Sequence, residues 1–600
     1  MQNIKNFIKT LEDSLAIVIL LLMAFLPAFM VFSRLVGING ISATTLIVQN
    51  LTLWIAFVGA IIATRENKLL SLLNPIEVET KINFNFKFLY SRIITLLVTL
   101  FLALSSFLLV KVEFEYGTDN LIGIPIWFVQ SIMPIGFLFI FFELLKPFNF
   151  KQNFKILSSI GFFLILIYIT VNSLNLDYRN NFILWLNLIL LLSSIILGAP
   201  IFIGLGGLAL LFFWFDSVPI AAIPTEMYRI VVSPTLPTIP LFTLSGYLLA
   251  NGGASKRLIE VFKSWFSWIP GGTPVVVTLV CGFFTALTGG SGVTILALGG
   301  LLLPMLIAEN YPKDFSSGLI TVSGSLGLLF PPSLAVIIYG VTAGVPINQI
   351  FIGGIIPGLL LIIMVSIWGI RQGFIAKVTR QKFNYKDAFK ALWDAKWEVF
   401  IPIFILIGIF GGFTTLVEVS AFTVVYVLLV EMFVYKDLNL KELPKVIIDC
   451  ATLVGGVLII LGVAMGFTSY LVDAQIPILA LDWVRENIQS KYVFLFALNI
   501  LLLLAGCLMD IFSAIIVLVP LIKPMANYFE VDPIHLAVIF IANLELGYLT
   551  PPVGMNLFLS AYRFEKDMTD IYKSVLPFFI ILLFTVLAIT YIPLLSLIFL

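Results

Sequence analysis

The sequence predicts an all-α polytopic membrane protein, made of a four-helix bundle, a linker helix and an inverted-repeat unit with two re-entrant hairpins. Hydrophobic residues make up 60% of the chain and charged residues only 11%, and the mean hydropathy is +1.11. A soluble globular chain carries roughly 25% charged residues. Apolar stretches recur along the whole chain, and two of them contain similar breaks in the same order. These observations place most of the chain in a lipid bilayer.

Charge and cysteine content exclude several other classes of protein. The 34 Lys and Arg residues nearly balance the 33 Asp and Glu residues, so the chain lacks the basic surface that binds nucleic acid. The three cysteines, Cys281, Cys450 and Cys507, lie in apolar runs and indicate neither a disulfide framework nor a metal site. The single histidine, His535, excludes a multi-histidine metal centre. No organic cofactor is expected.

Residues 1–150 predict a four-helix membrane domain with both ends in the cytoplasm. A span needs about 20 apolar residues, and Lys and Arg mark cytoplasmic loops. Lys5 and Lys9 place the N-terminus inside, and no small-residue cleavage site follows them, so we expect the first apolar run to be a retained helix. The expected spans are residues 15–32, 46–64, 93–110 and 125–145.

Residues 151–180 contain one further apolar stretch, 156–171, which we expect to be a linker helix that leads to the outside. This helix determines the direction of everything after it. Without it, each later span would cross the membrane in the opposite sense, and the basic loops would lie outside. With it, the C-terminus is expected on the periplasmic side.

Residues 181–600 predict two inverted repeats, at about 182–371 and 400–599. Residues 182–215 are expected to form two spans broken at Gly198-Ala199-Pro200, and residues 255–268 a helix in the membrane interface. The other expected spans are 228–250, 315–341 and 350–370 in the first repeat, and 400–413, 419–433, 446–470, 535–561 and 575–599 in the second. Seven Lys and Arg residues between 371 and 396 mark the connecting loop as cytoplasmic.

Two more apolar stretches, residues 274–307 and 492–525, are interrupted near their middle by small or polar residues. In the first stretch the interruption is the sequence TGGSG at residues 288–292. Each stretch is either two tight spans or a re-entrant hairpin. Short halves and glycine-containing tips favour hairpins, the first opening inward and the second outward.

A fixed register relates the two repeats. The spacing along the chain from Pro304 to Pro524, here called the repeat offset, equals the spacing from Gly327 to Gly547. The first copy ends in FPPS and the second in TPPVG, again separated by the repeat offset. Combined with the loop charges, this register predicts that each element of the second copy faces the opposite way from its partner. Paired apolar segments broken by Gly and Pro in two halves are the best sequence indication of a transporter's binding site.

Two groups of residues surround these breaks. Lipid cannot satisfy the carbonyl and amide groups that a break leaves without helical partners, so they must line a cavity or bind an ion. Unwound carbonyls suit Na⁺, and helix N-termini suit anions. One group joins Gly290, Ser291 and Gly292 to residues 324–332, and the other joins Gly506, Asp510 and Ser513 to residues 547–552. The alternative is a pair of proline-kinked helices in which glycine allows close packing.

Two acidic residues lie within apolar segments of the second repeat. An Asp at the centre of a membrane helix costs about 2.5–3.5 kcal/mol, so Asp510 needs a partner. A bound cation would be such a partner, and the alternatives are protonation or a hydrogen bond to a backbone amide at the hairpin tip. Glu545, between Asn543 and Thr550, is either a second ion or proton group or an interior polar partner.

Three motifs at the breaks are specific enough to compare with a known family: GGSGVT at residues 289–294, FPPS followed by YG within 330–340, and GYLTPPVGMN at 547–556. Together they resemble the large membrane subunit of tripartite ATP-independent periplasmic (TRAP) transporters, over about residues 182–600. Trp54, the pair Gly59-Ala60 and the ATRE of residues 63–66 resemble the small subunit, over about residues 1–148. Residues 156–171 resemble the linker helix of members in which both subunits are fused.

The resemblance implies a secondary transporter of the bacterial inner membrane and no enzymatic activity. Such proteins import an organic acid, for example a carboxylate or acidic sugar, by Na⁺ symport, and receive it from a separate periplasmic substrate-binding protein. The resemblance also implies an elevator mechanism, in which a transport domain that carries both hairpins slides against a scaffold extended by the small subunit.

The resemblance assigns residues to sites by motif. One Na⁺ would bind among Gly290, Ser291, Gly324, Gly327 and Pro331, and a second among Asp510, Gly547, Thr550 and Pro552. The substrate would lie between the hairpin tips, with Ser291, Gly292, Ser325, Ser333, Ser513, Asn543, Glu545, Gly554 and Asn556 as candidate contacts. Two alternatives stay open: a stand-alone Na⁺- or H⁺-coupled organic anion transporter without a binding protein, and a membrane-embedded enzyme, for which the sequence offers no converging nucleophile, acid and base.

Overall fold

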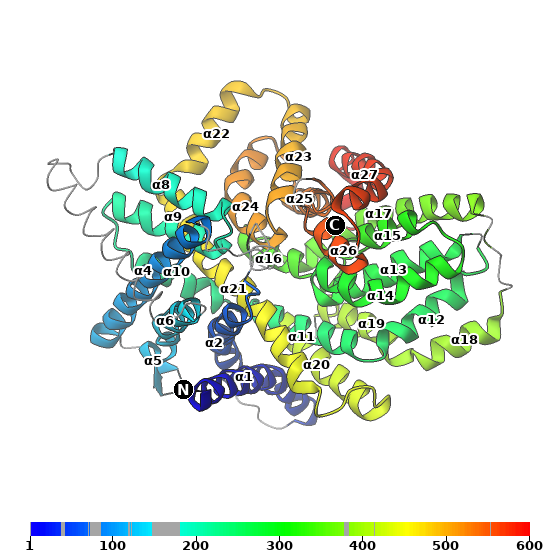
Figure 1. Cartoon of the computed structure of the whole chain (residues 1–600), viewed down its shortest axis with the longest axis horizontal. Helices are drawn as coiled ribbons and strands as arrows, with labels where there is room; N and C mark the ends of the chain where they lie inside the picture. The colour runs from blue at the N-terminus through cyan, green and yellow to red at the C-terminus, as the bar shows by residue number, and fades with distance from the viewer. Residues whose placement is uncertain are drawn as a thin grey trace. The chain divides into compact units, whose positions relative to one another are not determined.

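Helices make up nearly all of the backbone that the computed structural model describes (Figure 1). This description covers residues 2–37, 43–69, 71, 86–117, 120–121, 123–146, 181–269, 271–376, 378, 383–412, 414–551 and 554–600. Within these ranges, ten helices are long and apolar enough to cross a membrane. The all-α membrane class is therefore confirmed, alongside a short antiparallel pair of β1 (Asn120–Leu121) and β2 (Ile124–Pro125). The expected linker helix, residues 156–171, lies outside the described residues.

The chain divides into two compact units, each assembled from segments far apart in the sequence. The first contains Met1–Met23, Ile41–Pro237 and Ile448–Ile476, and the second contains Ala24–Gly40, Thr238–Ile447 and Pro477–Leu600. Two helices, α1 (Gln2–Val36) and α21 (Leu443–Asp473), belong to both units. One end of each helix lies in the first unit and the other end in the second.

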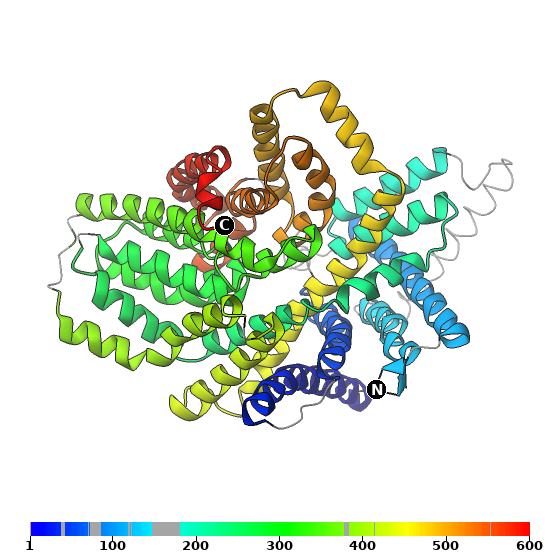
Figure 2. The same cartoon turned by 180° about the vertical axis from the view of Figure 1, so that it is seen from behind.

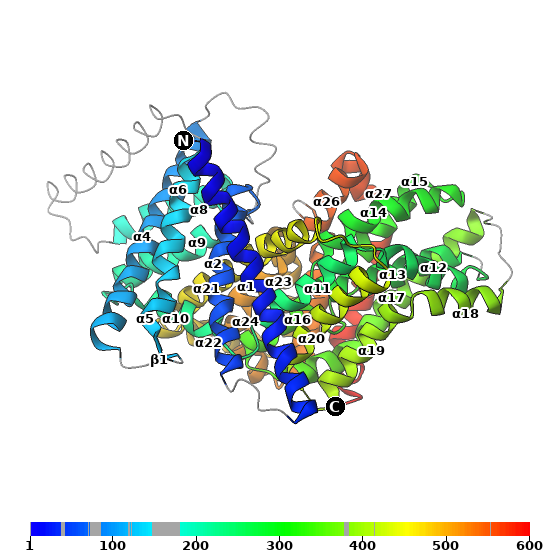
Figure 3. The ribbon, with the colours of Figure 1, turned by 90° about the horizontal axis from the view of Figure 1, so that it is seen from below.

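The first unit is a bundle of apolar helices. Its further members are α2 (Thr44–Arg65), α4 (Phe86–Tyr116), α5 (Ile126–Gln130), α6 (Ile132–Leu145), α8 (Asn181–Ile196), α9 (Ile201–Phe215) and α10 (Ala222–Val231). Helix α4 packs against α6, α8 and α9, and Figure 3 shows these helices side by side. The buried rings of Phe57 on α2 and Phe137 on α6 meet edge to face with centroids 5.1 Å apart. The predicted break of residues 182–215 at Gly198-Ala199-Pro200 is confirmed.

Two glycines bring α2 and α21 into close contact. A Cβ atom added to Gly455 would lie 2.2 Å from the carbonyl carbon of Gly59, and one added to Gly59 would lie 2.2 Å from the carbonyl oxygen of Ala451. Real Cβ atoms do not come this close to a neighbouring backbone. A Cβ added to the adjacent Gly456 would meet no other atom within 4 Å. Close helix packing therefore requires Gly59 and Gly455 but not Gly456.

The second unit contains both predicted hairpins and both broken helices. Its helices are α11 (Thr238–Asn251), α12 (Ala254–Phe266), α13 (Gly272–Thr288), α14 (Ser291–Ala308), α15 (Lys313–Ser323), α16 (Leu334–Ala343), α17 (Ile347–Ile375), α18 (Tyr385–Asp394), α19 (Lys396–Phe410), α20 (Leu416–Leu429), the π-helix η1 (Val430–Val434), α22 (Ile476–Asn487), α23 (Lys491–Leu508), α24 (Ile511–Tyr528), α25 (Pro533–Gly547), α26 (Met555–Phe564), α27 (Met568–Tyr591) and α28 (Leu594–Leu597). Figure 2 shows the same helices from behind. The packed neighbours α12, α13 and α14 lie side by side in Figure 1.

The predicted internal repeat is visible in the helix boundaries. Helices α14 and α24 begin and end at positions that differ by the repeat offset. The same offset separates the first residues of α15 and α25, and the last residues of α13 and α23. The contacts repeat as well: α14 packs against α26, and the equivalent helix α24 packs against α16. The second helix of each hairpin therefore packs on the half-helix that follows the break in the other repeat.

Several expected boundaries were wrong. Residues 228–250 do not form one span, because α10 ends at Val231 and α11 begins at Thr238. Pro234 and Pro237 lie between them, and proline disfavours a helical conformation in the residue before it. The last span ends at Tyr591, two residues before Pro593. Helix α18 occupies a stretch expected to be a loop, and α22 lies between the expected elements 446–470 and 492–525.

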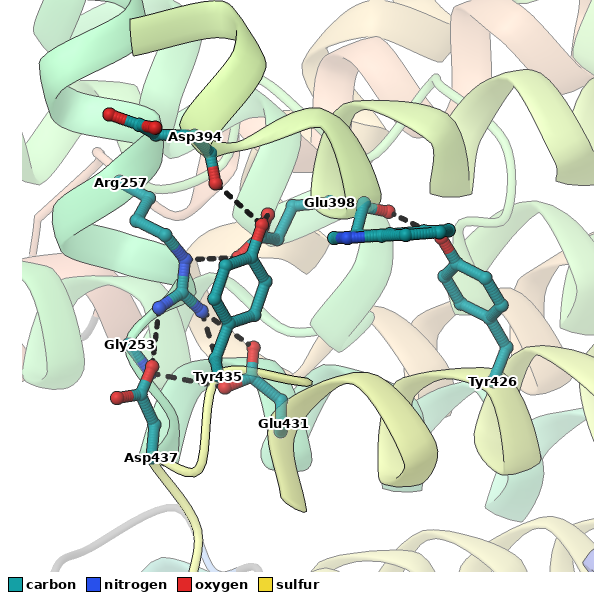
Figure 4. Close-up of polar contacts among 9 residues, drawn as sticks. Gly253, Arg257, Asp394, Glu398, Tyr426, Glu431, Tyr435 and Asp437 are labelled. Atoms are coloured by element: carbon teal, nitrogen blue, oxygen red, sulfur yellow. Dashed lines mark hydrogen bonds and ion pairs between the residues drawn. The ribbon is translucent and has the colours of Figure 1, made fainter. Parts of the chain in front are cut away.

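An ion network around Arg257 joins α12 to α19 and to the π-helix η1 (Figure 4). The guanidinium contacts the carboxylates of Glu398, Glu431 and Asp437 and lies 3.6 Å from the ring centroid of Tyr435. The side chains of Glu398 and Glu431 are fully buried. Burial alone would lower the pKa of the Arg257 guanidinium, but its hydrogen bond to Asp437 and the charges of both glutamates raise that pKa above its ordinary value. The arginine is therefore the constant counter-charge of two buried carboxylates.

The Arg257 network also depends on the glycines that precede α12. The Gly253 amide donates to Glu431 Oε2 at 3.3 Å. A Cβ on Gly252 would lie 2.3 Å from Glu431 Oε2, and one on Gly253 would lie 2.1 Å from Asp437 Oδ2. The α11–α12 junction thus rests directly on the acidic residues.

We expect Gly455→Ala to lower the free energy of unfolding by about 1–3 kcal/mol, because the added methyl group overpacks the contact with Gly59. Gly456→Ala is the matched control: the added methyl group meets nothing, and alanine favours a helix by up to about 1 kcal/mol over glycine. Thermal unfolding in detergent, followed by circular dichroism, checks both variants. Equal stability of the two variants would contradict the packing argument.

We expect Arg257→Met to destabilise the protein by about 3–5 kcal/mol, because it leaves Glu398 and Glu431 buried without a counter-charge. Arg229→Met is the control, since Arg229 pairs with Glu226 on the surface and its side chain is 69% exposed. Its loss should cost less than about 1 kcal/mol. Chemical unfolding monitored by intrinsic fluorescence measures both, and an Arg257→Met variant as stable as the control would refute a structural role for the network.

Candidate functional site

Two helical hairpins in the second unit form the frame of the candidate site. The first joins α13 to α14 through Gly289, whose φ is +70°, and Gly290, the N-cap of α14. The left-handed φ favours glycine at residue 289. The second joins α23 to α24 through Met509 and Asp510. The interruptions predicted within residues 274–307 and 492–525 are therefore confirmed, and a helix begins at the tip of each hairpin.

The broken helices complete the frame. The first break lies between α15 and α16. Turns replace the helix there, and their hydrogen bonds join residues three apart, such as the Phe330 amide and Gly327 O at 3.1 Å. The carbonyl oxygens of Leu326, Leu328 and Pro331 accept no hydrogen bond from any described residue. The second break lies between α25 and α26, and its Thr550 amide bonds to Gly547 O at 3.0 Å. Such free carbonyl oxygens are the ligands that unwound helices offer to Na⁺.

Each break crosses its own hairpin at a glycine. A Cβ on Gly327 would lie 2.7 Å from the Ala286 amide nitrogen, and one on Gly547 would lie 2.6 Å from the Cα of Gly506. The repeat offset separates Gly547 from Gly327, and it also separates Gly506 from Ala286. The two crossings are equivalent, so the repeat extends to the contact between hairpin and broken helix.

Asp510 caps α24. Its Oδ2 accepts hydrogen bonds from the amides of Phe512 and Ser513, both at 3.1 Å, and its Oδ1 accepts one from the Ser513 hydroxyl at 2.6 Å. This is the amide-bonded alternative considered for this residue, and the helix N-terminus stabilises a negative charge there. These three hydrogen bonds leave about one acceptor position of the carboxylate unused, since a carboxylate accepts about four.

Several predicted site residues carry buried oxygen atoms without a hydrogen-bond partner. These atoms are Ser291 Oγ, Ser333 Oγ, Asn543 Oδ1, both carboxylate oxygens of Glu545 and Asn556 Oδ1. Unsatisfied buried polar atoms are uncommon and cost about 1–3 kcal/mol each. A bound small cation or a polar substrate would satisfy them, so the residues present fit the sites assigned by resemblance.

Two predicted residues, Asn556 and Gly292, each contact a residue of the other repeat that was not predicted. The Asn556 side-chain amide donates to Thr321 O, and a Cβ on Gly292 would lie 2.6 Å from Leu559 Cδ1 on α26. Two other predicted residues have local partners, since Ser325 Oγ donates to Val322 O and Thr550 Oγ1 donates to Leu546 O. The Gly554 amide donates to Cys507 O and so joins the second break to the second hairpin. In the described residues no hydrogen bond joins Asp510 to Thr550. Pro552 lies outside the described residues.

Sequence reasoning missed four residues of this frame. Ser323 has a buried hydroxyl without a partner and precedes Asn543 by the repeat offset, so the register alone could have identified it. The Tyr548 hydroxyl accepts a hydrogen bond from the Ile511 amide at 2.6 Å and joins the second break to the second hairpin. Thr285 and Thr294 bond to each other inside the first hairpin. Thr294 and Tyr548 lie within the motifs at residues 289–294 and 547–556, but no sequence signal points to a role for Thr285.

The sequence of this chain matches two components of one family of membrane proteins. The family model for the tripartite ATP-independent periplasmic transporter, DctM component, matches residues 188–595, and the model for the DctQ component matches residues 23–148. A C4-dicarboxylate TRAP transporter large permease protein of Pseudomonas aeruginosa is 35% identical over 398 residues, 65% of this chain and 92% of that protein.

Two other relatives are named for different substrates. An isethionate TRAP transporter permease protein of Oleidesulfovibrio alaskensis is 31% identical over 404 residues, 66% of this chain and 63% of that protein. A 2,3-diketo-L-gulonate TRAP transporter large permease protein of Escherichia coli is 27% identical over 408 residues, 67% of this chain and 95% of that protein.

We expect Asp510→Asn to change the free energy of unfolding by less than about 0.5 kcal/mol, because asparagine caps a helix as well as aspartate does. Asp510→Ala removes the cap and should cost about 1 kcal/mol. Thermal unfolding of both variants in Na⁺-free buffer separates the cap from the charge. A loss in Asp510→Asn as large as in Asp510→Ala would show that the charge, and not the cap, stabilises the tip.

Proposed function

Since the chain belongs to the tripartite ATP-independent periplasmic transporter family and contains both of its membrane components in one polypeptide, we propose that it imports an organic acid across the bacterial inner membrane together with Na⁺. It is a multi-pass membrane transporter permease and not an enzyme.

The observation that carries the proposal is the pair of equivalent hairpins and broken helices. Each break leaves carbonyl oxygens at a point where a hairpin tip ends in a helix N-terminus. Carbonyl oxygens favour a cation and helix N-termini favour an anion, so one frame suits both members of a Na⁺–anion symport. We assign one Na⁺ to the first tip and break, through Ser291 and Gly324, and a second to Asp510 and Gly547.

The substrate is proposed to be a small organic acid bound between the hairpin tips. The relatives are named for a C4-dicarboxylate, isethionate and 2,3-diketo-L-gulonate, all small anions. The unpartnered oxygens of Ser291, Ser333 and Asn556 supply hydroxyl donors and an amide acceptor. They suit an acid that also carries hydroxyl groups.

The partner and the motion follow from the family. We propose that a periplasmic substrate-binding protein delivers the acid, with the N-terminus of this chain in the cytoplasm and the C-terminus in the periplasm. We also propose an elevator motion, in which both hairpins and both broken helices move as one body. Reciprocal packing of α14 on α26 and of α24 on α16 supports this, since it holds the four elements together.

Transport by the purified protein tests the proposal. In proteoliposomes, uptake of the acid bound by the cognate binding protein should require both an inward Na⁺ gradient and that protein. Asp510→Asn should weaken the dependence of uptake on Na⁺ concentration. Uptake that proceeds without the binding protein would favour the stand-alone transporter, and uptake driven equally well without Na⁺ would reject Na⁺ coupling.

A further inference from the structure

Two buried threonines connect the first hairpin to the first break. Thr285 on α13 and Thr294 on α14 are 0% and 1% exposed, and their hydroxyl oxygens are 2.8 Å apart. The Thr285 hydroxyl donates to the carbonyl oxygen of Gly324 at 2.7 Å. Because Thr285 has a single hydroxyl proton, Thr294 must be the donor in the bond between the threonines. The three groups therefore form a chain in which each bond polarises the next.

This chain determines where the Gly324 carbonyl points. Gly324 is the C-cap of α15, so its carbonyl lies at the negative end of that helix. The Cα of Gly324 packs directly on α14, since a Cβ on Gly324 would lie 2.5 Å from Ile295 Cγ1. A carbonyl oxygen has two lone pairs, and the bond from Thr285 uses one of them. The second remains available to a ligand.

The second repeat lacks this device. At the repeat offset from Thr285 and Thr294 the chain has Ala505 and Ala514, which carry no hydroxyl. At the same offset from Gly290 it has Asp510, a carboxylate. Between residues 271 and 344 the acidic residues are Glu309, which follows the last residue of α14, and Asp314, in the first turn of α15. Neither is at the tip of the first hairpin.

We propose that the Thr285–Thr294 pair is the positioning element of the first cation site, and that this site is built from neutral oxygens while the second is anchored by Asp510. The assignment rests on the proposed Na⁺ coupling. Thr285 acts through Gly324: it holds the carbonyl against the hairpin so that its free lone pair faces the ion. The two sites therefore differ in chemistry, although the helices around them are equivalent.

Binding of Na⁺ to the purified protein tests this assignment without requiring transport. Thr285→Val keeps the shape of the side chain and removes the hydroxyl. We expect it to raise the Na⁺ concentration that gives half of the Na⁺-dependent thermal stabilisation by roughly tenfold, as the loss of one buried hydrogen bond implies. Thr285→Ser restores the hydroxyl and should return this concentration close to the wild-type value. Thr294→Val leaves the bond to Gly324 and should give a smaller increase.

Thr423→Val is the matched control. Thr423 is a buried threonine of the same unit, and its hydroxyl bonds to Val419 O of its own helix at 2.7 Å. It should leave the half-saturating Na⁺ concentration unchanged. Uptake in proteoliposomes should show the same order as the binding measurement, through the Na⁺ concentration for half-maximal rate.

Two results would overturn the assignment: wild-type Na⁺ affinity in Thr285→Val, or an equal loss in Thr285→Val and Thr285→Ser. Should Thr285→Val fail to fold, Thr294→Val carries the test, and wild-type Na⁺ affinity there would reject the pair. A wild-type protein that shows no response to Na⁺ would instead reject the proposed Na⁺ coupling itself. The two failures are therefore distinguishable.

Discussion

Backbone groups at membrane depth must find partners within the protein, and this constraint shapes the second unit of the structure. Lipid offers no hydrogen bonds, so a helix can break in the membrane only where other parts of the chain cover the break. Here Gly327 and Gly547 allow each hairpin to approach its break at backbone distance. The side chains of Thr285, Tyr548 and Cys507 then form hydrogen bonds with backbone groups that have no helical partner. The carbonyls that remain are the ones that the proposed Na⁺ would use.

The two repeats satisfy the same constraint with different side chains. The helix boundaries and the glycine crossings are equivalent at the repeat offset. The polar groups are not: the first repeat uses neutral hydroxyls inside its hairpin, and the second uses a carboxylate at the tip that also caps a helix. A duplicated backbone thus supports two chemically distinct surroundings, because the packing depends on small residues while the ligands depend on a few polar ones.

The register of prolines and glycines was enough to predict the repeat and both breaks, because each copy shows these residues in the same order along the sequence. The assignment of residues to ion and substrate sites came from the resemblance of the motifs and stays a prediction. The break between α10 and α11 was missed although Pro234 and Pro237 were visible, since an apolar run around them satisfied the length of a span. The Arg257 network could not be predicted, because its partners Glu398, Glu431 and Asp437 come from 141 to 180 residues away. The role of Thr285 depends likewise on a carbonyl 39 residues away that only the fold brings near.

The reciprocal packing of the hairpins has a consequence for biogenesis. Helix α14 packs on α26, which begins at Met555, so the first hairpin has no complete surroundings until nearly the whole chain has left the ribosome. During synthesis the glycine-rich tip of this hairpin and the unpaired carbonyls of the first break therefore lack part of their final packing. Contacts between segments this distant form late and slow the folding of a chain. Truncation before the second repeat therefore removes α26, the helix on which α14 of the first hairpin packs.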